Sequence, residues 1–367
     1  MYIFTWLIKY VIIISVNEID CIGDFCMFQY LKSEPIINSF WFWSDPLIII
    51  KNVKNSMFWI YNNFINLRVY NEEPLSNLYF YNGCYRNKMV EMFDCPYLSM
   101  QKINFDIHNE KQLLGTYSLE EIIKYSKDYN LFILLMVNRF HIKVYNYKEE
   151  NNHQILIYHY DEKNNIVKFC DNFSDGKFRT NLSCTINEIK KAYINFNGQK
   201  NEPDFSTGIF LLQPREDNTY TILWERIKEQ IVLFLNKQNV LNTEWWSYGI
   251  KVYDIIIIGL KNAIKSLNSI DYKFICVLYD HKKVMLLRLQ MLRLYFEFND
   301  ELIDDYMVIK NKTNILVNLI LKYNKTRKIS ILYKCINILS EIMNDEEHIL
   351  NSIVEAMPDP IPKSIKK

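Results

Sequence analysis

Residues 260–357 contain neither glycine nor proline, and this limits what the second half of the chain can form. Both residue types interrupt regular structure, so their absence over such a length favours long, unbroken helices. Apolar residues also recur at helical spacing in this half, in segments 219–236, 245–267, 281–297 and 315–343. We therefore predict an all-helical domain over residues 214–367.

The first half of the chain has a different pattern, with short β-rich runs and few helices. Runs of strand length occupy residues 131–137, 155–160, 165–170 and 205–212, and polar residues 161–164 provide a hairpin turn. We predict helices over residues 20–32, 118–127 and 185–193, and we interpret the aromatic run within 39–50 as a strand or a packed loop. Residues 1–213 are therefore expected to form an α+β domain.

Length and charge exclude several classes of protein. A chain of 367 residues with a formal net charge of +1 is long enough for about two domains. No global positive field attracts nucleic acid, and no basic stripe with interleaved aromatic residues is present. The eight cysteines are too sparse for a disulfide scaffold and lack zinc-ligand spacing. We expect mostly reduced thiols in a cytoplasmic protein.

The first 16 residues are apolar but short for a membrane span, and they lack the small-residue cleavage site of a signal peptide. We interpret them as a buried strand that leads to residue 21. A membrane anchor is the alternative interpretation.

Three residues, far apart in sequence, have the types and settings of a cysteine acyl-transfer triad. Cys21 opens a predicted helix, His153 opens an apolar strand, and Asp171 ends the next strand, 18 residues later. A helix N-terminus and a neighbouring imidazolium favour a thiolate, which attacks a carbonyl or thioester carbon. A carboxylate on the far ring nitrogen fixes the imidazole tautomer. The order Cys, His, Asp is that of papain-type enzymes.

Each of these residues also has an ordinary structural interpretation. A cysteine at a helix start is often a small buried hydrophobic residue, and a histidine before an apolar strand is often a surface or edge residue. Cys26 is a competing nucleophile, but it lies inside the predicted helix, where the helix dipole gives little help.

Several segments resemble the butirosin biosynthesis protein H family, whose members resemble papain-fold bacteriocin-leader peptidases. The resemblance is strongest over residues 131–193 and extends thinly over most of the chain. The matching segments are 137–140 (VNRF), 152–162 (NHQILIYHYDE), 171–178 (DNFSDGKF), 188–193 (EIKKAY), 249–254 (GIKVYD) and 278–285 (LYDHKKVM). The shorter match at Asp20-Cys21 is less specific.

The resemblance implies a papain-like fold for residues 1–213 and a thiol acyltransferase activity. Family members move an acyl group from a carrier-protein thioester to an amine and so form an amide in natural-product biosynthesis. By motif position, Cys21 is the nucleophile, His153 the base and Asp171 the residue that orients it.

Two positions depart from the family pattern. His159 stands where the motif usually has glycine, and on a regular strand it shares a face with His153, six residues earlier. It is therefore either a second base or a core or edge residue. No glutamine precedes Cys21 to complete an oxyanion hole; Asn17 is the nearest amide side chain, and the backbone N–H of Cys21 is another donor.

The expected activity is amide formation through an acyl-Cys21 intermediate, with no metal or organic cofactor and with a phosphopantetheine-linked acyl donor. The expected partners are a carrier protein and a small amine, not nucleic acid or a membrane. A papain-like cysteine peptidase or amide hydrolase, and a non-catalytic binding protein of the same fold, are the alternatives. The helical domain is left with three alternative roles: covering the cleft, docking a carrier protein, or forming a homodimer.

Overall fold

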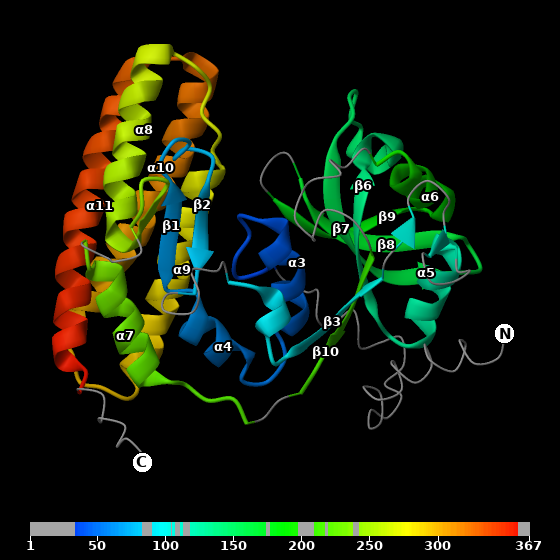
Figure 1. Ribbon diagram of the computed structural model, residues 1–367, viewed down its shortest axis with the longest axis horizontal. Helices are drawn as coiled ribbons and strands as arrows, with labels where there is room; N and C mark the ends of the chain where they lie inside the picture. Colours follow the sequence, from blue (N-terminus) through cyan, green and yellow to red (C-terminus); the bar gives the residue numbers. More distant parts are fainter. Residues whose placement is uncertain are drawn as a thin grey trace.

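The computed structural model describes residues 34–82, 90–103, 105–106, 111–112, 118–173, 177–196, 209–216, 219–237 and 242–358. Within these ranges the protein is mixed α and β, as the sequence predicts. A large antiparallel sheet lies at one end of the molecule and a group of long helices at the other (Figure 1).

The large sheet has the strand order β3-β10-β6-β7-β8-β9, and every neighbouring pair is antiparallel. The strands are β3 (Leu98–Ile103), β6 (Phe132–Asn138), β7 (Asn152–Asp161), β8 (Ile166–Asn172), β9 (Phe178–Thr185) and β10 (Ile209–Pro214). The predicted strands at 131–137, 155–160 and 165–170 are therefore confirmed, with shifted ends, and so is the part of 205–212 that the structure describes, from Ile209 onward. A small separate ladder pairs β4 (Phe105–Asp106) with β5 (Lys111–Gln112).

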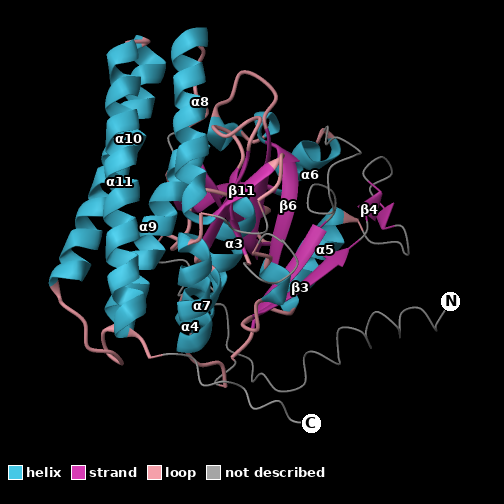
Figure 2. Ribbon diagram, turned by 60° about the vertical axis from the view of Figure 1, so that its left-hand side comes forward, coloured by secondary structure: helices cyan, strands magenta, loops and turns pink. Residues whose placement is uncertain are grey.

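Two helices cover one face of this sheet (Figure 2). They are α5 (Leu119–Asp128) and α6 (Ile186–Ile194), and both were predicted. Each begins with a capping box, Ser118 with Glu121 and Thr185 with Glu188, which satisfies N–H groups at the helix start. Short 3₁₀ turns η2 (Arg139–His141) and η3 (Lys143–Tyr145) lead from β6 toward β7.

A β-bulge interrupts the pairing of β7 with β8 between Ile157 and His159. Before the bulge, Ile155 and Ile157 pack in the core under α5 and α6; after it, Tyr160 takes that face. The bulge therefore reverses the face on which odd-numbered β7 residues lie.

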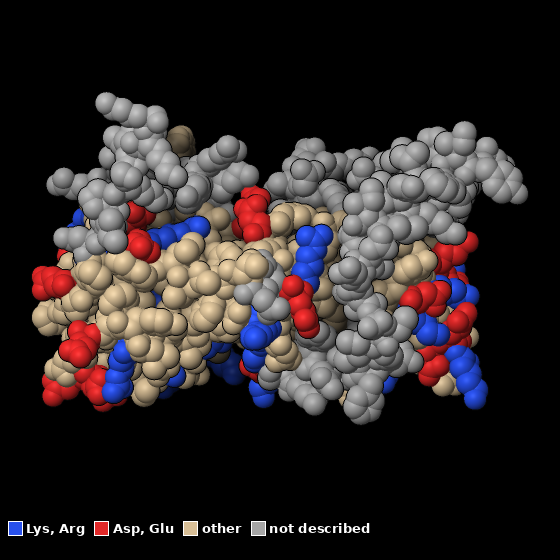
Figure 3. All heavy atoms as spheres, turned by 90° about the horizontal axis from the view of Figure 1, so that it is seen from below, with Lys and Arg blue, Asp and Glu red and all other residues tan. Residues whose placement is uncertain are grey.

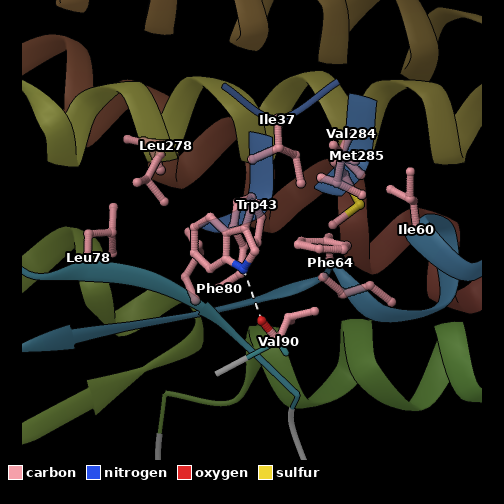
Figure 4. Packing of buried hydrophobic residues seen from close by; sticks show 14 of the residues in the cluster. Ile37, Trp43, Ile60, Phe64, Leu78, Phe80, Val90, Leu278, Val284 and Met285 are labelled. Atoms are coloured by element: carbon pink, nitrogen blue, oxygen red, sulfur yellow. Dashed lines mark hydrogen bonds between the residues drawn. The ribbon is translucent and has the colours of Figure 1, made fainter. Parts of the chain in front are cut away.

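The other face of the sheet contacts helix α3 (Trp41–Ile50), where we predicted a strand or packed loop. That prediction is wrong. Trp43 is fully buried and packs against the rings of Phe64 and Phe80 (Figure 4). Its indole N–H donates to the carbonyl oxygen of Val90 at 2.9 Å. The aromatic run therefore belongs to a buried helix and not to a strand.

The helical half packs around a small second sheet. Its helices are α4 (Ser56–Asn63), α7 (Trp224–Leu235), α8 (Val252–Ser266), α9 (Lys273–Leu292), α10 (Glu301–Thr326) and α11 (Ile329–Ala356). The sheet has the order β11-β1-β2, with β1 (Asn66–Tyr70), β2 (Leu78–Tyr81) and β11 (Trp246–Tyr248). Short 3₁₀ turns are η1 (Met92–Asp94) and η4 (Gly249–Lys251).

Three details of the helical prediction need correction. Residues 214–367 are not all helical, because β11 pairs with β1. Helix α9 begins at Lys273, eight residues before the predicted start at 281. The predicted segment 315–343 contains a helix break at Arg327, whose φ of 54° ends α10 without a glycine.

The largest hydrophobic core includes residues from α3, from one face of the large sheet and from α7–α11. It crosses the predicted boundary at residue 213, as does the pairing of β1 with β11. The division into domains 1–213 and 214–367 stays a prediction.

The surface charges and the helices relate to the predicted lack of a positive field and of a membrane span. Acidic and basic side chains are interspersed on the face seen in Figure 3. Among the residues that the structure describes, no helix combines the length and apolar character needed to span a membrane.

Candidate active site

Two of the three predicted triad residues lie in contact. Strands β7 and β8 are antiparallel neighbours, and His153 and Asp171 lie near the same end of the pair. The Nδ1 atom of His153 lies 2.9 Å from Oδ1 of Asp171. The tight turn at residues 161–164 therefore brings together two side chains that are 18 positions apart, as the sequence predicts.

The surroundings of His153 favour one tautomer. Its Nδ1 is 2.8 Å from the carbonyl oxygen of Gln154, in addition to the carboxylate of Asp171. Two acceptors at one ring nitrogen assign the proton to Nδ1, so Nε2 carries the lone pair. The His153 side chain is 22% exposed, whereas that of Asp171 is 1% exposed. A partly exposed imidazole on a buried carboxylate is the arrangement that a general base needs.

The second oxygen of Asp171 has partners of its own. Oδ2 accepts a hydrogen bond from Nη1 of Arg139 at 3.0 Å and another from the hydroxyl of Tyr145. Burial, followed by the charge of Asp171 and the hydrogen bond to it, raises the pKa of Tyr145 well above its ordinary value. Tyr145 therefore stays protonated and donates to the carboxylate.

Arg139 is fixed by more than its ion pair. Nε donates to Oδ1 of Asn151 at 2.8 Å, and Nη1 also donates to the carbonyl oxygen of Asn172 at 2.8 Å. The guanidinium carbon lies 5.1 Å from the ring centre of Tyr145 and 5.2 Å from that of Tyr147. These contacts hold a planar cation in one orientation beside Asp171.

A second carboxyl group, that of Asp45 on α3, is buried near this pair. Burial is the main cause that raises its pKa well above the ordinary value, and the charge of Asp171 raises it further. The two carboxyl groups therefore differ: Asp171 is paired with Arg139, while Asp45 favours its neutral form.

The remaining predicted site residues divide into two groups. Cys21 and Asn17, together with the competing Cys26, lie outside the residues that the structure describes. His159 is described, and the bulge at residues 157–159 places it on the face opposite that of His153. The predicted shared face is therefore wrong, because the extra residue of a bulge breaks the two-residue alternation.

The described cysteines have the chemistry of buried thiols. Burial is the main cause that raises the pKa of each one: to about 12 for Cys95, Cys276 and Cys335, and above the ordinary value for Cys170 and Cys184. A thiol with a raised pKa is a poor nucleophile at neutral pH.

A group of three or more His, Cys, Asp or Glu side chains that suits a metal ion does not occur in the described part of the chain. No protein-family model matches the sequence, and no curated protein is detectably similar to it. The resemblance to the butirosin biosynthesis protein H family therefore remains an interpretation of the motifs.

Arg139 and Tyr145 were not predicted as parts of the site. Arg139 directly follows the apolar strand β6 and is 5% exposed. A charged residue adjoining an apolar strand was the available signal, and it lies within the VNRF segment on which the resemblance partly depends. The partner of that charge depends on strand pairing, which local sequence does not encode.

Proposed function

We propose that the protein is a cysteine-dependent acyltransferase that forms an amide from a carrier-bound thioester and an amine. The contact between His153 and Asp171 carries the proposal, because it supplies an oriented general base whose Nε2 is unprotonated. We also propose that residues 1–213 have a papain-like fold, with Cys21 as nucleophile and Asn17 and the Cys21 N–H as oxyanion donors. The antiparallel sheet that carries both His153 and Asp171 supports this part.

In the first half-reaction, Nε2 of His153 takes the proton of the Cys21 thiol. The sulfur attacks the thioester carbonyl, a bond forms between Sγ and the acyl carbon, and the bond to the carrier sulfur breaks. The imidazolium then gives its proton to the departing thiolate. The products are acyl-Cys21 and the free thiol of the carrier.

In the second half-reaction, the amine attacks the acyl carbon of acyl-Cys21. His153 takes one amine proton and returns it to the sulfur of Cys21 as the amide leaves. Each cycle consumes one thioester and one amine and releases one amide and one thiol. The expected acyl donor is a phosphopantetheine thioester on a carrier protein.

The test measures intact-protein mass after incubation with acyl-pantetheine thioesters of different chain types. We expect a mass increase equal to the acyl group, which is lost in Cys21→Ser and kept in the matched variant Cys26→Ser. His153→Gln should slow adduct formation by at least about 100-fold, the usual contribution of a general base. An adduct that persists in Cys21→Ser contradicts the assignment of the nucleophile.

The fate of the adduct separates transfer from hydrolysis. Adding a panel of amines to the isolated adduct should discharge it to amides faster than water does. Release of free acid at the same rate with and without amine indicates a hydrolase instead. Absence of any adduct with every donor, in a folded protein, contradicts an acyl-cysteine mechanism.

A further inference from the structure

We propose that Arg139 and Tyr145 are positioning residues that compensate the charge of Asp171 and keep its carboxylate turned toward His153. This inference rests on the proposed function for its catalytic consequence, but the arrangement itself is independent of the substrate. Neither residue contacts the reacting atoms in the proposed mechanism; both act through the carboxylate.

The two carboxylate oxygens of Asp171 have different neighbours. Oδ2 of Asp171 receives both Arg139 Nη1, at 3.0 Å, and the hydroxyl of Tyr145. Oδ1 makes no aligned hydrogen bond within the described part of the protein and lies 2.9 Å from Nδ1 of His153. Because Arg139 and Tyr145 occupy one oxygen, the other is left for the imidazole.

The buried charge of Asp171 requires a compensating charge nearby. Asp171 is 1% exposed at its side chain, and an isolated charge at such a site is strongly disfavoured. Arg139, itself 7% exposed at its side chain, supplies the compensating positive charge. Asp45 does not act as a second anion that competes for the charge of Arg139, because burial favours the neutral form of the Asp45 carboxyl group.

The planar shape of the Arg139 cation matters as well as its charge. Arg139 binds three acceptors at once: Oδ1 of Asn151, Oδ2 of Asp171 and the carbonyl oxygen of Asn172. Lysine carries the same charge but lacks the planar fork that spans these acceptors. A lysine at this position should therefore supply the compensating charge beside Asp171 and restore only part of its orientation.

The test compares Arg139→Met, Arg139→Lys and Tyr145→Phe with the control Arg215→Met. Arg215 is exposed and donates to Ser99 on β3. The first readout is the tautomer of His153, measured from its ring ¹⁵N shifts and assigned with His153→Gln. We expect wild type and Arg215→Met to carry the proton on Nδ1. Arg139→Met should shift the population toward the Nε2–H form, with Arg139→Lys in between.

The second readout is the pH profile of acyl-Cys21 formation. Arg139→Met should lower the rate at neutral pH by at least about tenfold and change the shape of the profile, because the carboxylate loses the cation that holds it beside His153. Arg139→Lys should restore part of the rate, because it supplies the charge without the planar fork. Tyr145→Phe keeps the ring and loses only the hydroxyl, so its effect should be smaller and in the same direction.

The two readouts separate the possible failures. If the tautomer shifts as expected but no acyl adduct forms in wild type, the positioning role holds and the proposed function fails. If Arg139→Met is folded and keeps the wild-type tautomer and pH profile, the positioning role is overturned. Should Arg139→Met not fold, a wild-type tautomer and pH profile in both Arg139→Lys and Tyr145→Phe overturn it instead.

Discussion

Lys282 on α9 and Glu346 on α11 form an ion pair from which solvent is fully excluded. The ammonium nitrogen lies 2.5 Å from Oε1 and 2.6 Å from Oε2 of Glu346, and both side chains are 0% exposed. The hydroxyls of Tyr253 on α8 and Tyr306 on α10 also donate to this carboxylate. Four helices of the C-terminal half therefore converge on one buried charge pair.

Removing one charge of this pair should strongly destabilise the protein. Glu346→Gln leaves Lys282 without its counter-ion in the core, and we expect the free energy of unfolding to fall by about 3–5 kcal/mol. The adjacent Glu347 pairs with Lys237 at 2.7 Å on the surface, so Glu347→Gln is a matched control that should cost less than about 1 kcal/mol. Urea unfolding followed by circular dichroism measures both. Equal losses would contradict a special role for the buried pair.

The neighbouring His281 should make stability depend on pH. Its Nε2 donates to the carbonyl oxygen of Ile65 at 2.7 Å, so Nδ1 accepts from Lys282 at 2.9 Å, and the ring must be neutral. Burial, and then the charge of Lys282, lowers the pKa of His281 well below its ordinary value. The stability that this residue contributes is therefore present above the unfolded-state pKa near 6.5 and is lost as the pH falls.

We expect the free energy of unfolding to drop by up to about 1.4 kcal/mol for each pH unit below 6.5 on account of His281. Urea titrations at pH 7.5, 6.5 and 5.5 measure this slope. His281→Gln should flatten it, whereas His348→Gln, at an exposed position on α11, should leave it unchanged. A slope that survives His281→Gln would assign the dependence to other groups.

Asp45 should make stability depend on pH in the opposite direction, so that stability falls as the pH rises. Its pKa is raised in the folded protein, mainly by burial and then by Asp171, so its contribution to stability is complete below the unfolded-state value and is lost as the pH rises. Asp45→Asn removes this loss and should raise the free energy of unfolding at pH 8 by about 1 kcal/mol or more. Thermal unfolding of both proteins at pH 5 and pH 8 tests it. A variant that is less stable than wild type at pH 8 would contradict the prediction.

Local sequence signals were sufficient to predict much of the large sheet and two residues of the site, His153 and Asp171. The helices that follow Ser118 and Thr185 and the polar turn after β7 are encoded within a few residues, and they were predicted correctly. Once β7 and β8 pair through that turn, the contact of His153 with Asp171 follows from strand geometry. The mixed α and β character follows from the same periodicities.

The missed features depend on partners distant in sequence. Helix α3 is preceded by Asn38 and Ser39, whose N–H groups donate to the carboxylate of Asp280, more than 240 positions away for both. An aromatic run alone does not reveal that anchor, so it favoured a strand. The helix-start interpretation of the 281–297 segment failed for a related reason, because His281 lies inside α9 and binds Ile65.

Strand β11 is a third such case, and it leads to a prediction at the residue that follows it. Its three residues are strand only because they pair with β1, and Gly249 then turns the chain with a φ of 62°. A Cβ at this position would lie 2.4 Å from the carbonyl oxygen of Phe234, at the end of α7. The conformation and the space both require glycine.

Gly249→Ala should therefore lower the free energy of unfolding by about 2–4 kcal/mol, since it combines left-handed backbone strain with a backbone clash. Asn130→Ala is the matched control, because Asn130 has a φ of 52° at an exposed turn and tests the strain alone. We expect it to cost about 1 kcal/mol or less. Urea unfolding of the two variants measures the difference, and a Gly249→Ala loss no larger than that of Asn130→Ala would show that the junction of α7 with β11 yields to the added methyl group.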